Sequence, residues 1–326
     1  MRAIQIDRTG GPEVLHGVEV DVPEPGPGEV RVRHRAVGLN FIDTYHRSGL
    51  YPLPLPATLG VEGAGVVEAL GAGVTHLAVG DRVAYAAPRP GSYAEARVLP
   101  ALVVVRLPDA IDDARGAAMM LKGLTVQYLL RRTRPQQPLE QGDFLVWHAA
   151  AGGVGLIACQ WAKALGYRLI ATAGSDEKCQ LALQHGAAHA INYHTRDVVA
   201  SVRELTDGRG VRVVYDSVGK DTWERSLDCL APLGLMVSFG SASGPVPPVN
   251  LAQLAQKGSL YVTRPTLFTH MASREAVDEM SGELFDLVTS GQIRIDPPRT
   301  YPLEAAADAH RELEGRATTG ASVLIP

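Results

Sequence analysis

Residues 144–166 read FLVWHAAAGGVGLIACQWAKALG, and this stretch decides the fold. The apolar run FLVW predicts a buried strand, and residues 155–166 predict a helix that ends in glycine. Between them, Ala150, Gly152 and Gly155 form the pattern A-x-G-x-x-G, a dinucleotide-binding turn with alanine in place of its first glycine. Alanine can serve there if its φ stays negative. Gly152 would let the backbone approach a pyrophosphate, and Gly155 would let the helix pack closely on the strand.

Strands and helices then alternate up to residue 264. The strands are rich in Val, Ile and Leu, as parallel strands buried on both faces are. This order predicts an α/β fold with a Rossmann-type, doubly wound, six-stranded parallel sheet. The expected strands are FLVWHAA (144–150), RLIATAG (168–174), HAINY (189–193), VRVVYDSVG (211–219), GLMVSFG (234–240) and GSLYVTR (258–264). The expected helices between them lie within 155–166, 176–186, 197–206 and 222–230.

The residues after the second strand decide which dinucleotide fits the turn. An NAD site usually has an acid there to bind the ribose 2′-OH, whereas an NADP site needs cations or other donors. Here the strand ends at Gly174 and Ser175, and Lys178 follows. Asp176 favours NAD, but in a helix that begins at Ser175 it lies in the first turn, where acids complement the helix dipole. NADP is therefore favoured over NAD.

The first 120 or so residues have a different pattern. Short alternating runs, such as EVRVRHRAVGL (29–39), are broken by Gly and Pro and predict a compact β barrel or sandwich. A chain of 326 residues fits two domains. The last residues, ASVLIP (321–326), predict a final strand, and because the six-stranded sheet is already filled, we expect it to return to the first domain.

Composition narrows the class of protein. A net charge of −4 gives no reason to expect a nucleic acid or an anionic membrane as a partner. No apolar run reaches the roughly 20 residues of a membrane-spanning helix, and the N-terminus lacks the apolar core of a signal peptide. We therefore expect a cytoplasmic protein.

The cysteines and histidines predict a mechanism without a metal ion. Cys159, Cys179 and Cys229 are scattered and form no CxxC pair, so we expect small buried side chains rather than a disulfide framework or a thiolate zinc site. A catalytic zinc ion needs three Cys, His, Asp or Glu ligands. In the N-terminal part, His34, His46 and His76 have no helical spacing, and we expect surface or locally hydrogen-bonded side chains.

These features together resemble the medium-chain dehydrogenase/reductase superfamily, and within it the zinc-free NADPH:quinone oxidoreductases of the zeta-crystallin type. In the zinc-dependent relatives, a metal-binding Cys stands where this chain has NFIDTY (40–45), and Gly-His-Glu stands where it has GVEGAG (60–65). The resemblance runs along essentially the whole chain. Its other carriers are GGPEVL (10–15), GDRVAY (80–85), LKGLTVQYLL (121–130), HAAAGGVGLIACQWAKALG (148–166), VVYDSVGKDTWERSLDCL (213–230), GLMVSFGSASG (234–244) and KGSLYVTRP (257–265).

The resemblance implies a GroES-like β-barrel catalytic domain formed by residues 1–122 and 265–326, and a Rossmann NADPH-binding domain at 123–264. It places Asn40, Asp43 and Tyr45 in the catalytic pocket, with Phe41 and Ile42 beside the nicotinamide. Lys122 and Thr125 would approach the cofactor from the next helix. Ala151, Gly152, Gly153 and Val154 would hold the pyrophosphate. The 2′-phosphate would be bound by Gly174, Ser175, Lys178, Tyr193 and Arg316. The remaining cofactor contacts would be made by Ser217, Phe239, Gly240, Ser241 and Phe268.

The expected activity is metal-free reduction of a quinone by NADPH, in which the cofactor carries the chemistry and the protein supplies position and electrostatics. Two alternatives remain. One is a reductase of α,β-unsaturated ketones or aldehydes, for which Tyr45 is a conceivable proton donor. The other is a nucleotide-binding protein with a structural or RNA-associated role and little turnover. The family also implies a homodimer, formed through the sheet edge around residues 257–264.

Overall fold

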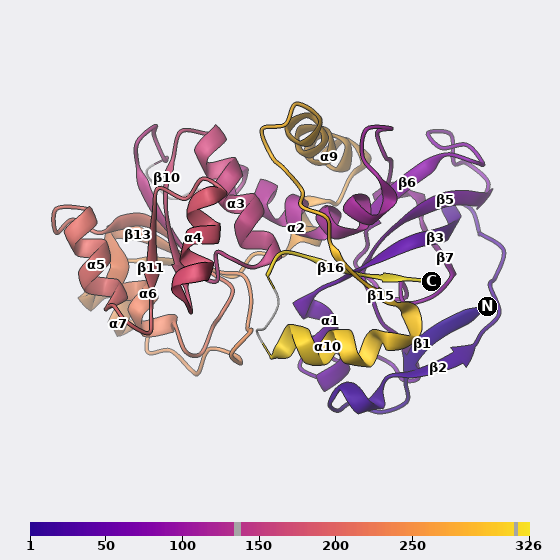
Figure 1. The fold of residues 1–326 in the computed structure, drawn as a ribbon, viewed down its shortest axis with the longest axis horizontal. Coiled ribbons are helices and arrows are strands. Elements are labelled where there is room, and N and C mark those ends of the chain that lie inside the picture. The colour runs from indigo at the N-terminus through magenta and orange to yellow at the C-terminus, as the bar shows by residue number, and fades with distance from the viewer. Residues whose placement is uncertain (134–137, 316–318) are drawn as a thin grey trace. The chain divides into compact units, whose positions relative to one another are not determined.

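The computed structural model describes residues 1–133, 138–315 and 319–326 and divides into two compact units (Figure 1). Unit 1 comprises Met1–Leu124, His270–Gly291 and Ile295–Pro326, and unit 2 comprises Thr125–Thr269 and Gln292–Arg294. Within the described residues, none of the helices combines the length and the apolar character that crossing a membrane requires.

Unit 2 contains a six-stranded sheet with the spatial order β11-β10-β9-β12-β13-β14, and every neighbouring pair is parallel. The strands are β9 (Phe144–Trp147), β10 (Arg168–Ala173), β11 (His189–Asn192), β12 (Val211–Asp216), β13 (Leu230–Ser238) and β14 (Tyr261–Thr263). This is the order 3-2-1-4-5-6 of a doubly wound dinucleotide-binding sheet. The predicted α/β fold and its six strands are therefore confirmed.

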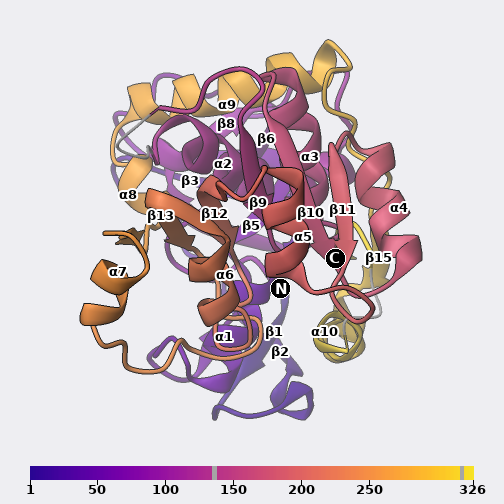
Figure 2. The ribbon, with the colours of Figure 1, turned by 90° about the vertical axis from the view of Figure 1, so that its left-hand side faces the viewer.

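Helices flank this sheet (Figure 2). They are α3 (Gly153–Ala164), α4 (Asp176–Gln184), α5 (Val198–Leu205), α6 (Trp223–Cys229) and the short α7 (Ala252–Gln256). Val146, Ile170 and Val214 from three strands share one buried cluster with Val202 of α5 and Leu227 of α6. Because side chains alternate along a strand, Tyr215 points to the opposite face, where its hydroxyl donates to Leu129 O of α2 (Asp113–Arg131).

Unit 1 is built mainly from antiparallel strands that are far apart in the sequence. One sheet has the order β2-β1-β4, and the other has the order β15-β16-β3-β5-β6-β8, with β7 paired to β3. Their bounds are β1 (Arg2–Ile6), β2 (His16–Glu19), β3 (Glu29–Leu39), β4 (Ala57–Thr58), β5 (Glu62–Leu70), β6 (Arg82–Ala86), β7 (Ala96–Pro100), β8 (Val104–Arg106), β15 (Arg299–Pro302) and β16 (Ser322–Ile325).

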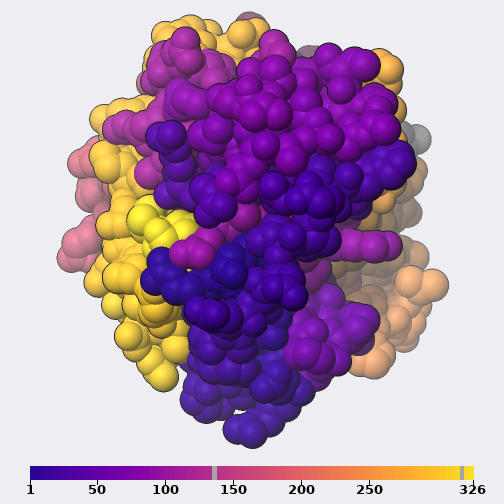
Figure 3. Space-filling view, turned by 90° about the vertical axis from the view of Figure 1, so that its right-hand side faces the viewer, coloured from indigo at the N-terminus to yellow at the C-terminus, as the bar shows by residue number. Residues whose placement is uncertain are grey.

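The C-terminal strand β16 pairs antiparallel with β3, so the end of the chain returns to the N-terminal sheet as the sequence predicts. Figure 3 shows these last residues, in yellow, beside N-terminal segments in indigo. The helices of this unit besides α2 are α1 (Phe41–Ser48), α9 (Arg274–Thr289) and α10 (Ala306–Glu314). Helix α8 (Leu267–His270) crosses the boundary between the units.

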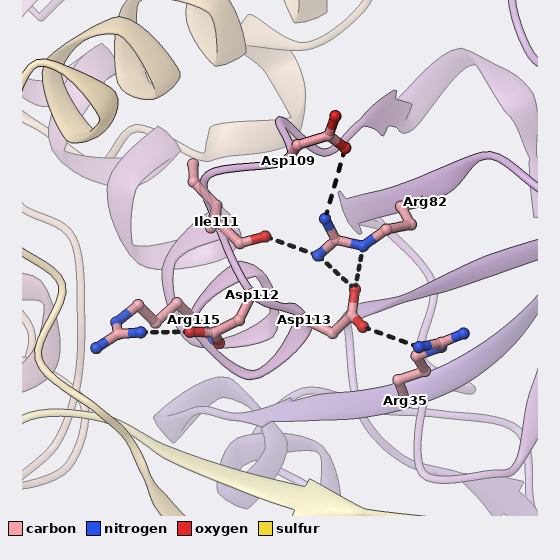
Figure 4. Close-up of polar contacts among 7 residues, drawn as sticks. All are labelled: Arg35, Arg82, Asp109, Ile111, Asp112, Asp113 and Arg115. Carbon is pink, nitrogen blue, oxygen red and sulfur yellow. Dashed lines mark hydrogen bonds and ion pairs between the residues drawn. The ribbon is translucent and has the colours of Figure 1, made fainter.

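Charged side chains fix the start of α2, the helix that carries Lys122. Arg82 donates to Asp113 Oδ1 over 3.0 Å and to Ile111 O over 2.7 Å (Figure 4). Arg35 lies 3.7 Å from the other carboxylate oxygen of Asp113. An acid in the first turn also complements the helix dipole. The helix therefore begins at a defined position, which sets where Lys122 lies about two and a half turns later.

Candidate active site

The turn after β9 has the geometry of a pyrophosphate site. Its positive φ falls at Ala149, with φ 54°, and not at Ala150, which meets the condition for alanine in the first glycine position. Gly152 caps α3, whose first N–H groups have no partner within the helix and therefore suit an anion. A Cβ on Gly155 would lie 2.5 Å from Ala150 Cα, so only glycine allows this close packing. Ala151 is buried inside the turn, while Gly153 and Val154 are half-buried in the first turn of α3.

The residues predicted for the 2′-phosphate come together after β10. A Cβ on Gly174 would lie 2.6 Å from the Tyr193 hydroxyl oxygen, so these two residues are in contact. Ser175 caps α4 by accepting the backbone N–H of Lys178 over 3.3 Å. Asp176 lies in the first turn of α4, and its carboxylate accepts a 2.8 Å hydrogen bond from the Asn192 amide. Its presence therefore has a local explanation. Arg316, predicted for the same phosphate, lies outside the described residues.

A third loop follows β13 at the same edge of the sheet. A Cβ on Gly240 would lie 2.4 Å from Ser217 O, so the loops after β12 and β13 touch here. The Phe239 ring packs against Trp147, with 5.5 Å between the ring centroids. Arg264 donates to Gly240 O over 2.8 Å and to Ser241 Oγ over 3.3 Å.

These three loops leave the carboxyl ends of β9, β10 and β13 in one parallel sheet, the edge at which ligands bind in such sheets. The glycine contacts show that Gly155, Gly174 and Gly240 pack directly against neighbouring atoms at this edge, with no room for a side chain. The predicted Thr125 and Phe268 also belong to unit 2 and are half-buried, on α2 and α8 respectively.

In unit 1, the predicted substrate residues gather at the start of α1. Asn40 caps this helix in a capping box, because its side chain accepts the Asp43 N–H while the Asp43 carboxylate accepts the Asn40 N–H. Phe41 and Ile42 form the first turn and are half-buried. Tyr45 is buried, and its ring meets Tyr51 edge-on, with 5.3 Å between the centroids.

A buried ion pair lies beside Asn40. The Lys122 ammonium donates to Glu62 Oε2 over 3.1 Å, and the Asn40 side-chain amide donates to the same oxygen over 2.7 Å. The Leu121 N–H donates to the other carboxylate oxygen over 2.8 Å. The side chain of Glu62 is fully buried and that of Lys122 is 7% exposed. Each charge is therefore compensated away from water, as a buried ion pair requires.

Asp43 is also the end of a second buried chain of hydrogen bonds. The Tyr93 hydroxyl donates to Asp43 Oδ2 over 3.0 Å and lies 3.0 Å from His310 Nε2. Arg47 donates to His310 Nδ1 over 2.9 Å. An arginine can only donate, so Nδ1 accepts, Nε2 carries the proton and the Tyr93 oxygen accepts it. The chain thus runs in one direction, from the guanidinium to the carboxylate.

Burial dominates the electrostatics of this chain. It raises the pKa of Asp43 to about 7, against the hydrogen bonds from the Asn40 N–H and the Tyr93 hydroxyl and the charge of Lys122, which lower it. It also lowers the pKa of His310 to about 3, and the neighbouring Arg47 adds to that shift. His310 is therefore neutral near pH 7, whereas Asp43 is close to half-protonated.

The expectations for cysteines and histidines are mostly confirmed. All three cysteines are free and buried, and burial raises the pKa values of Cys159 and Cys229 to about 12. His34 and His76 are hydrogen-bonded locally, to Ala94 O and Ala101 O among others. His46 differs, because its ring is buried and Nδ1 has no hydrogen-bond partner. The His46 ring lies edge-on to Tyr51, with 6.0 Å between the ring centroids, a contact that the sequence spacing did not reveal.

Among the residues that the structure describes, no group of three or more His, Cys, Asp and Glu side chains could hold a metal ion. Sequence reasoning also missed several polar residues near the candidate site, namely Arg47, Tyr93, His148, Asp216, Arg264 and His310. Except for Asp216, whose partners are Val218, Gly219, Thr222 and Ser226, these residues have partners that are distant in the sequence, so no local pattern marks them. His148, Asp216 and Arg264 lie inside stretches that carry the family resemblance, although sequence reasoning assigned them no role.

Comparisons with known proteins agree along the whole chain. The profile of alcohol dehydrogenase GroES-like domains matches residues 26–109, and that of zinc-binding dehydrogenases matches residues 153–282. A quinone oxidoreductase of Pseudomonas aeruginosa is 59% identical over 100% of this chain and 99% of its own length. A 2-haloacrylate reductase of a Burkholderia species is 45% identical, covering 99% of this chain and 98% of its own length. The crystal structure of Escherichia coli quinone oxidoreductase with NADPH superposes with a TM-score of 0.97 at 53% identity, covering 100% of both chains.

Proposed function

This chain belongs to the quinone oxidoreductases of the medium-chain dehydrogenase/reductase superfamily, and we propose that it reduces quinones with NADPH and without a metal ion. The observation that carries the choice of cofactor is the group formed by Gly174, Ser175 and Tyr193 after β10. When bound, NADPH supplies the hydride. The protein binds and orients it, and we assign these tasks to unit 2 as the cofactor domain and to unit 1 as the catalytic domain.

Unit 2 would bind the two charged parts of the cofactor at two loops. The N-terminus of α3, from Gly152 to Val154, would hold the pyrophosphate through backbone N–H groups and the helix dipole. Gly174, Ser175, Tyr193 and Lys178 would surround the 2′-phosphate, with Arg316 as a further cation. The loops at Ser217 and at Phe239–Ser241, together with Thr125 and Phe268, would line the rest of the cofactor.

The donor set in unit 1 supports a reaction without zinc. The two stretches that carry metal ligands in zinc-dependent relatives supply Asn40 and Glu62 here, and Glu62 accepts hydrogen bonds from both Asn40 and Lys122. An ammonium ion only donates hydrogen bonds and repels a metal cation. We propose that its positive charge stabilises the negative charge that grows on a quinone oxygen as the hydride arrives.

The remaining residues at the start of α1 would shape the quinone site. The capping box holds Asn40 and Asp43 against the first turn, so Phe41 and Ile42 keep a fixed direction. Contact with Tyr51 restrains the ring of Tyr45, which we propose as a wall of the pocket. An enone would additionally need a proton at its α carbon, and Tyr45 is the candidate donor in that case.

Steady-state rates with NADPH and NADH test this function, using 1,4-benzoquinone, a naphthoquinone and a simple enone as acceptors. We expect NADPH to be preferred and the quinones to react faster than the enone. Equal efficiency with NADH would refute the 2′-phosphate site. Faster reduction of the enone would favour the reductase alternative, and tight NADPH binding without turnover would favour the structural one.

Lys178 can be tested separately within the same assay. Lys178→Met should raise the KM for NADPH and leave that for NADH unchanged, because only NADPH presents the 2′-phosphate. Lys163→Met is the matched control, since Lys163 is an exposed lysine at the last turn of α3. If both variants change the KM for NADPH equally, Lys178 has no specific role.

We also propose a homodimer formed through β14. This strand is at the edge of the six-stranded sheet, and Tyr261 and Val262 on it are 43% and 39% exposed. An edge strand offers unpaired backbone groups to a second chain. Light scattering should give a dimer for the wild type and a monomer for Val262→Lys. Val79→Lys, at an exposed apolar residue of unit 1, should leave the dimer intact.

Finally, we place the protein in the cytoplasm. Three free, buried cysteines fit a reducing compartment, where thiols stay unpaired. Fractionation of cells, with the protein followed by immunoblot, tests this assignment.

A further inference from the structure

A buried chain of polar side chains lies directly beneath the predicted cofactor loops of unit 2. The His148 Nδ1 atom is 2.8 Å from Thr172 Oγ1, and Nε2 is 3.0 Å from Ser226 Oγ. The Ser226 hydroxyl donates to Asp216 Oδ2 over 2.8 Å. All four residues are at most 2% exposed. None of these side chains has a task in the binding scheme proposed above.

The chemistry of the groups fixes the direction of every bond in this chain. Asp216 Oδ1 accepts the backbone N–H groups of Val218 and Gly219, over 2.7 and 3.0 Å, and Oδ2 accepts the hydroxyl protons of Thr222 and Ser226. Because Ser226 spends its only proton on Asp216, its oxygen must accept from His148.

The ring of His148 therefore carries its proton on Nε2, and Nδ1 accepts the hydroxyl proton of Thr172. Burial lowers the pKa of His148, which is consistent with a neutral ring. A neutral imidazole with one donor and one acceptor satisfies both neighbours, so the chain holds one tautomer and one ring orientation.

The chain joins three strand ends that each lead into a cofactor loop. His148 follows β9 and opens the pyrophosphate turn, Thr172 lies two residues before Gly174, and Asp216 directly precedes Ser217. The backbone strengthens these links, since Ala150 N–H donates to Thr172 O over 3.1 Å. A change in the spacing of the three strand ends would have to break this chain.

We propose that His148 is a positioning residue for NADPH, which fixes the spacing between the pyrophosphate turn, the 2′-phosphate loop and the loop at Ser217. This inference rests on the proposed function, because it assumes that the cofactor spans these loops. A ligand that occupies all three needs them at one fixed spacing, whereas a ligand that occupies a single loop does not.

Thr172→Val tests the proposal, because it removes the donor to His148 Nδ1 but keeps the shape of the side chain. Titration should show NADPH binding about tenfold weaker, since a buried partner of the hydrogen bond is left unsatisfied. Binding of 2′-AMP, which has the 2′-phosphate but lacks the 5′-phosphate that would reach the pyrophosphate turn, should change less than about twofold. Thr172→Ser keeps the hydroxyl and should restore NADPH binding. Ser226→Ala, which removes the acceptor of His148 Nε2–H, should act like Thr172→Val.

Thr206→Val is the matched control. Thr206 is a buried threonine of unit 2 whose hydroxyl donates to Val202 O and accepts the Gly210 N–H. Its loss should lower the thermal midpoint as Thr172→Val does, but leave NADPH affinity unchanged. The proposal is overturned if Thr206→Val weakens NADPH binding as much as Thr172→Val does, if the binding of NADPH and of 2′-AMP weakens equally, or if Thr172→Ser fails to restore binding.

The same titrations separate this inference from the proposed function. If the wild type binds NADH as tightly as NADPH, the 2′-phosphate assignment fails, while the effect of Thr172→Val on a whole dinucleotide still decides the role of His148. In the wild type, nitrogen NMR of the His148 ring should show a protonated Nε2 and an unprotonated Nδ1. The opposite tautomer would refute the direction of the chain.

Discussion

Replacing Asp43 with asparagine should remove a pH dependence of stability that the buried carboxyl group imposes. Asp43 Oδ2 accepts the Asn40 N–H and the Tyr93 hydroxyl proton, whereas Oδ1 is buried without a partner. The oxygen of an asparagine side chain can accept both of these bonds. The variant therefore keeps the shape and the hydrogen bonds of the site and removes only the titration.

The magnitude follows from the pKa of Asp43, which is about 7 in the folded protein against a usual value of 3.8. Between these values the folded state holds a proton that the unfolded state has released, so the free energy of unfolding falls as the pH rises. The full difference corresponds to about 4 kcal/mol at 1.36 kcal/mol per pKa unit. From about pH 5 to pH 8, the titration of Asp43 should lower the free energy of unfolding of the wild type by about 3 kcal/mol.

Urea unfolding of wild type and Asp43→Asn across this pH range measures the difference. His34 and His310, whose pKa values are lowered to about 4 and about 3, contribute the opposite slope below their usual pKa. Both proteins contain these two histidines, so their contribution to the pH dependence of stability cancels when the two proteins are compared. We expect the variant to gain on the wild type by about 3 kcal/mol from about pH 5 to pH 8. Parallel curves for the two proteins would refute the reasoning.

Three further predictions concern the other parts of the site. Gly155→Ala should lower the free energy of unfolding by about 1–3 kcal/mol, because the new Cβ would meet backbone atoms at 2.5 Å. Gly152→Ala leaves 3.3 Å between its Cβ and the nearest atom, so it should keep the thermal midpoint of the wild type and weaken only NADPH binding, measured by fluorescence titration. Glu177→Gln should tighten NADPH binding about twofold and leave NADH binding unchanged, because it removes an exposed negative charge beside the 2′-phosphate site. Lys122→Met should lower the free energy of unfolding in urea by about 3–5 kcal/mol, since Glu62 is left buried without a cation, and adding Glu62→Gln should restore most of it.

The sequence predicts the fold of unit 2 well because its strands, except β14 at the edge, are largely buried. Most of them, such as Phe144–Trp147, are short and mainly apolar runs bounded by turn residues, and consecutive elements pack next to each other. In unit 1 the strands can be recognised but their partners cannot. Strand β3 pairs with β5, β7 and β16, and this last pairing joins residues 37–39 to residues 322–324. Nothing local in the sequence specifies such distant partners.

The candidate site divides in the same way. The glycine turn, Ser175 as the cap of α4 and Asp176 in its first turn follow from local rules of helix capping and steric fit. The buried polar chains do not, because all their side-chain links except Asp216–Ser226 join residues at least 24 positions apart. Arg47 and His310, for example, are 263 residues apart. Only the folded structure shows that a histidine without helical spacing has a donor on one ring nitrogen and an acceptor on the other.

Both buried chains follow one physical rule. Each chain ends at a group whose hydrogen-bonding role is fixed. The Arg47 guanidinium can only donate, and Asp216 accepts from two backbone N–H groups, which can only donate. The ambiguous members between such ends, histidines and hydroxyls, have one arrangement that leaves no buried proton unpaired. An alternative arrangement would cost about 1–3 kcal/mol for each unsatisfied group. The direction of these hydrogen bonds, as well as packing, thus fixes the position of α1 in unit 1 and of the strand ends in unit 2. Removing a single hydroxyl group from either chain should therefore weaken binding more than the small size of the group suggests.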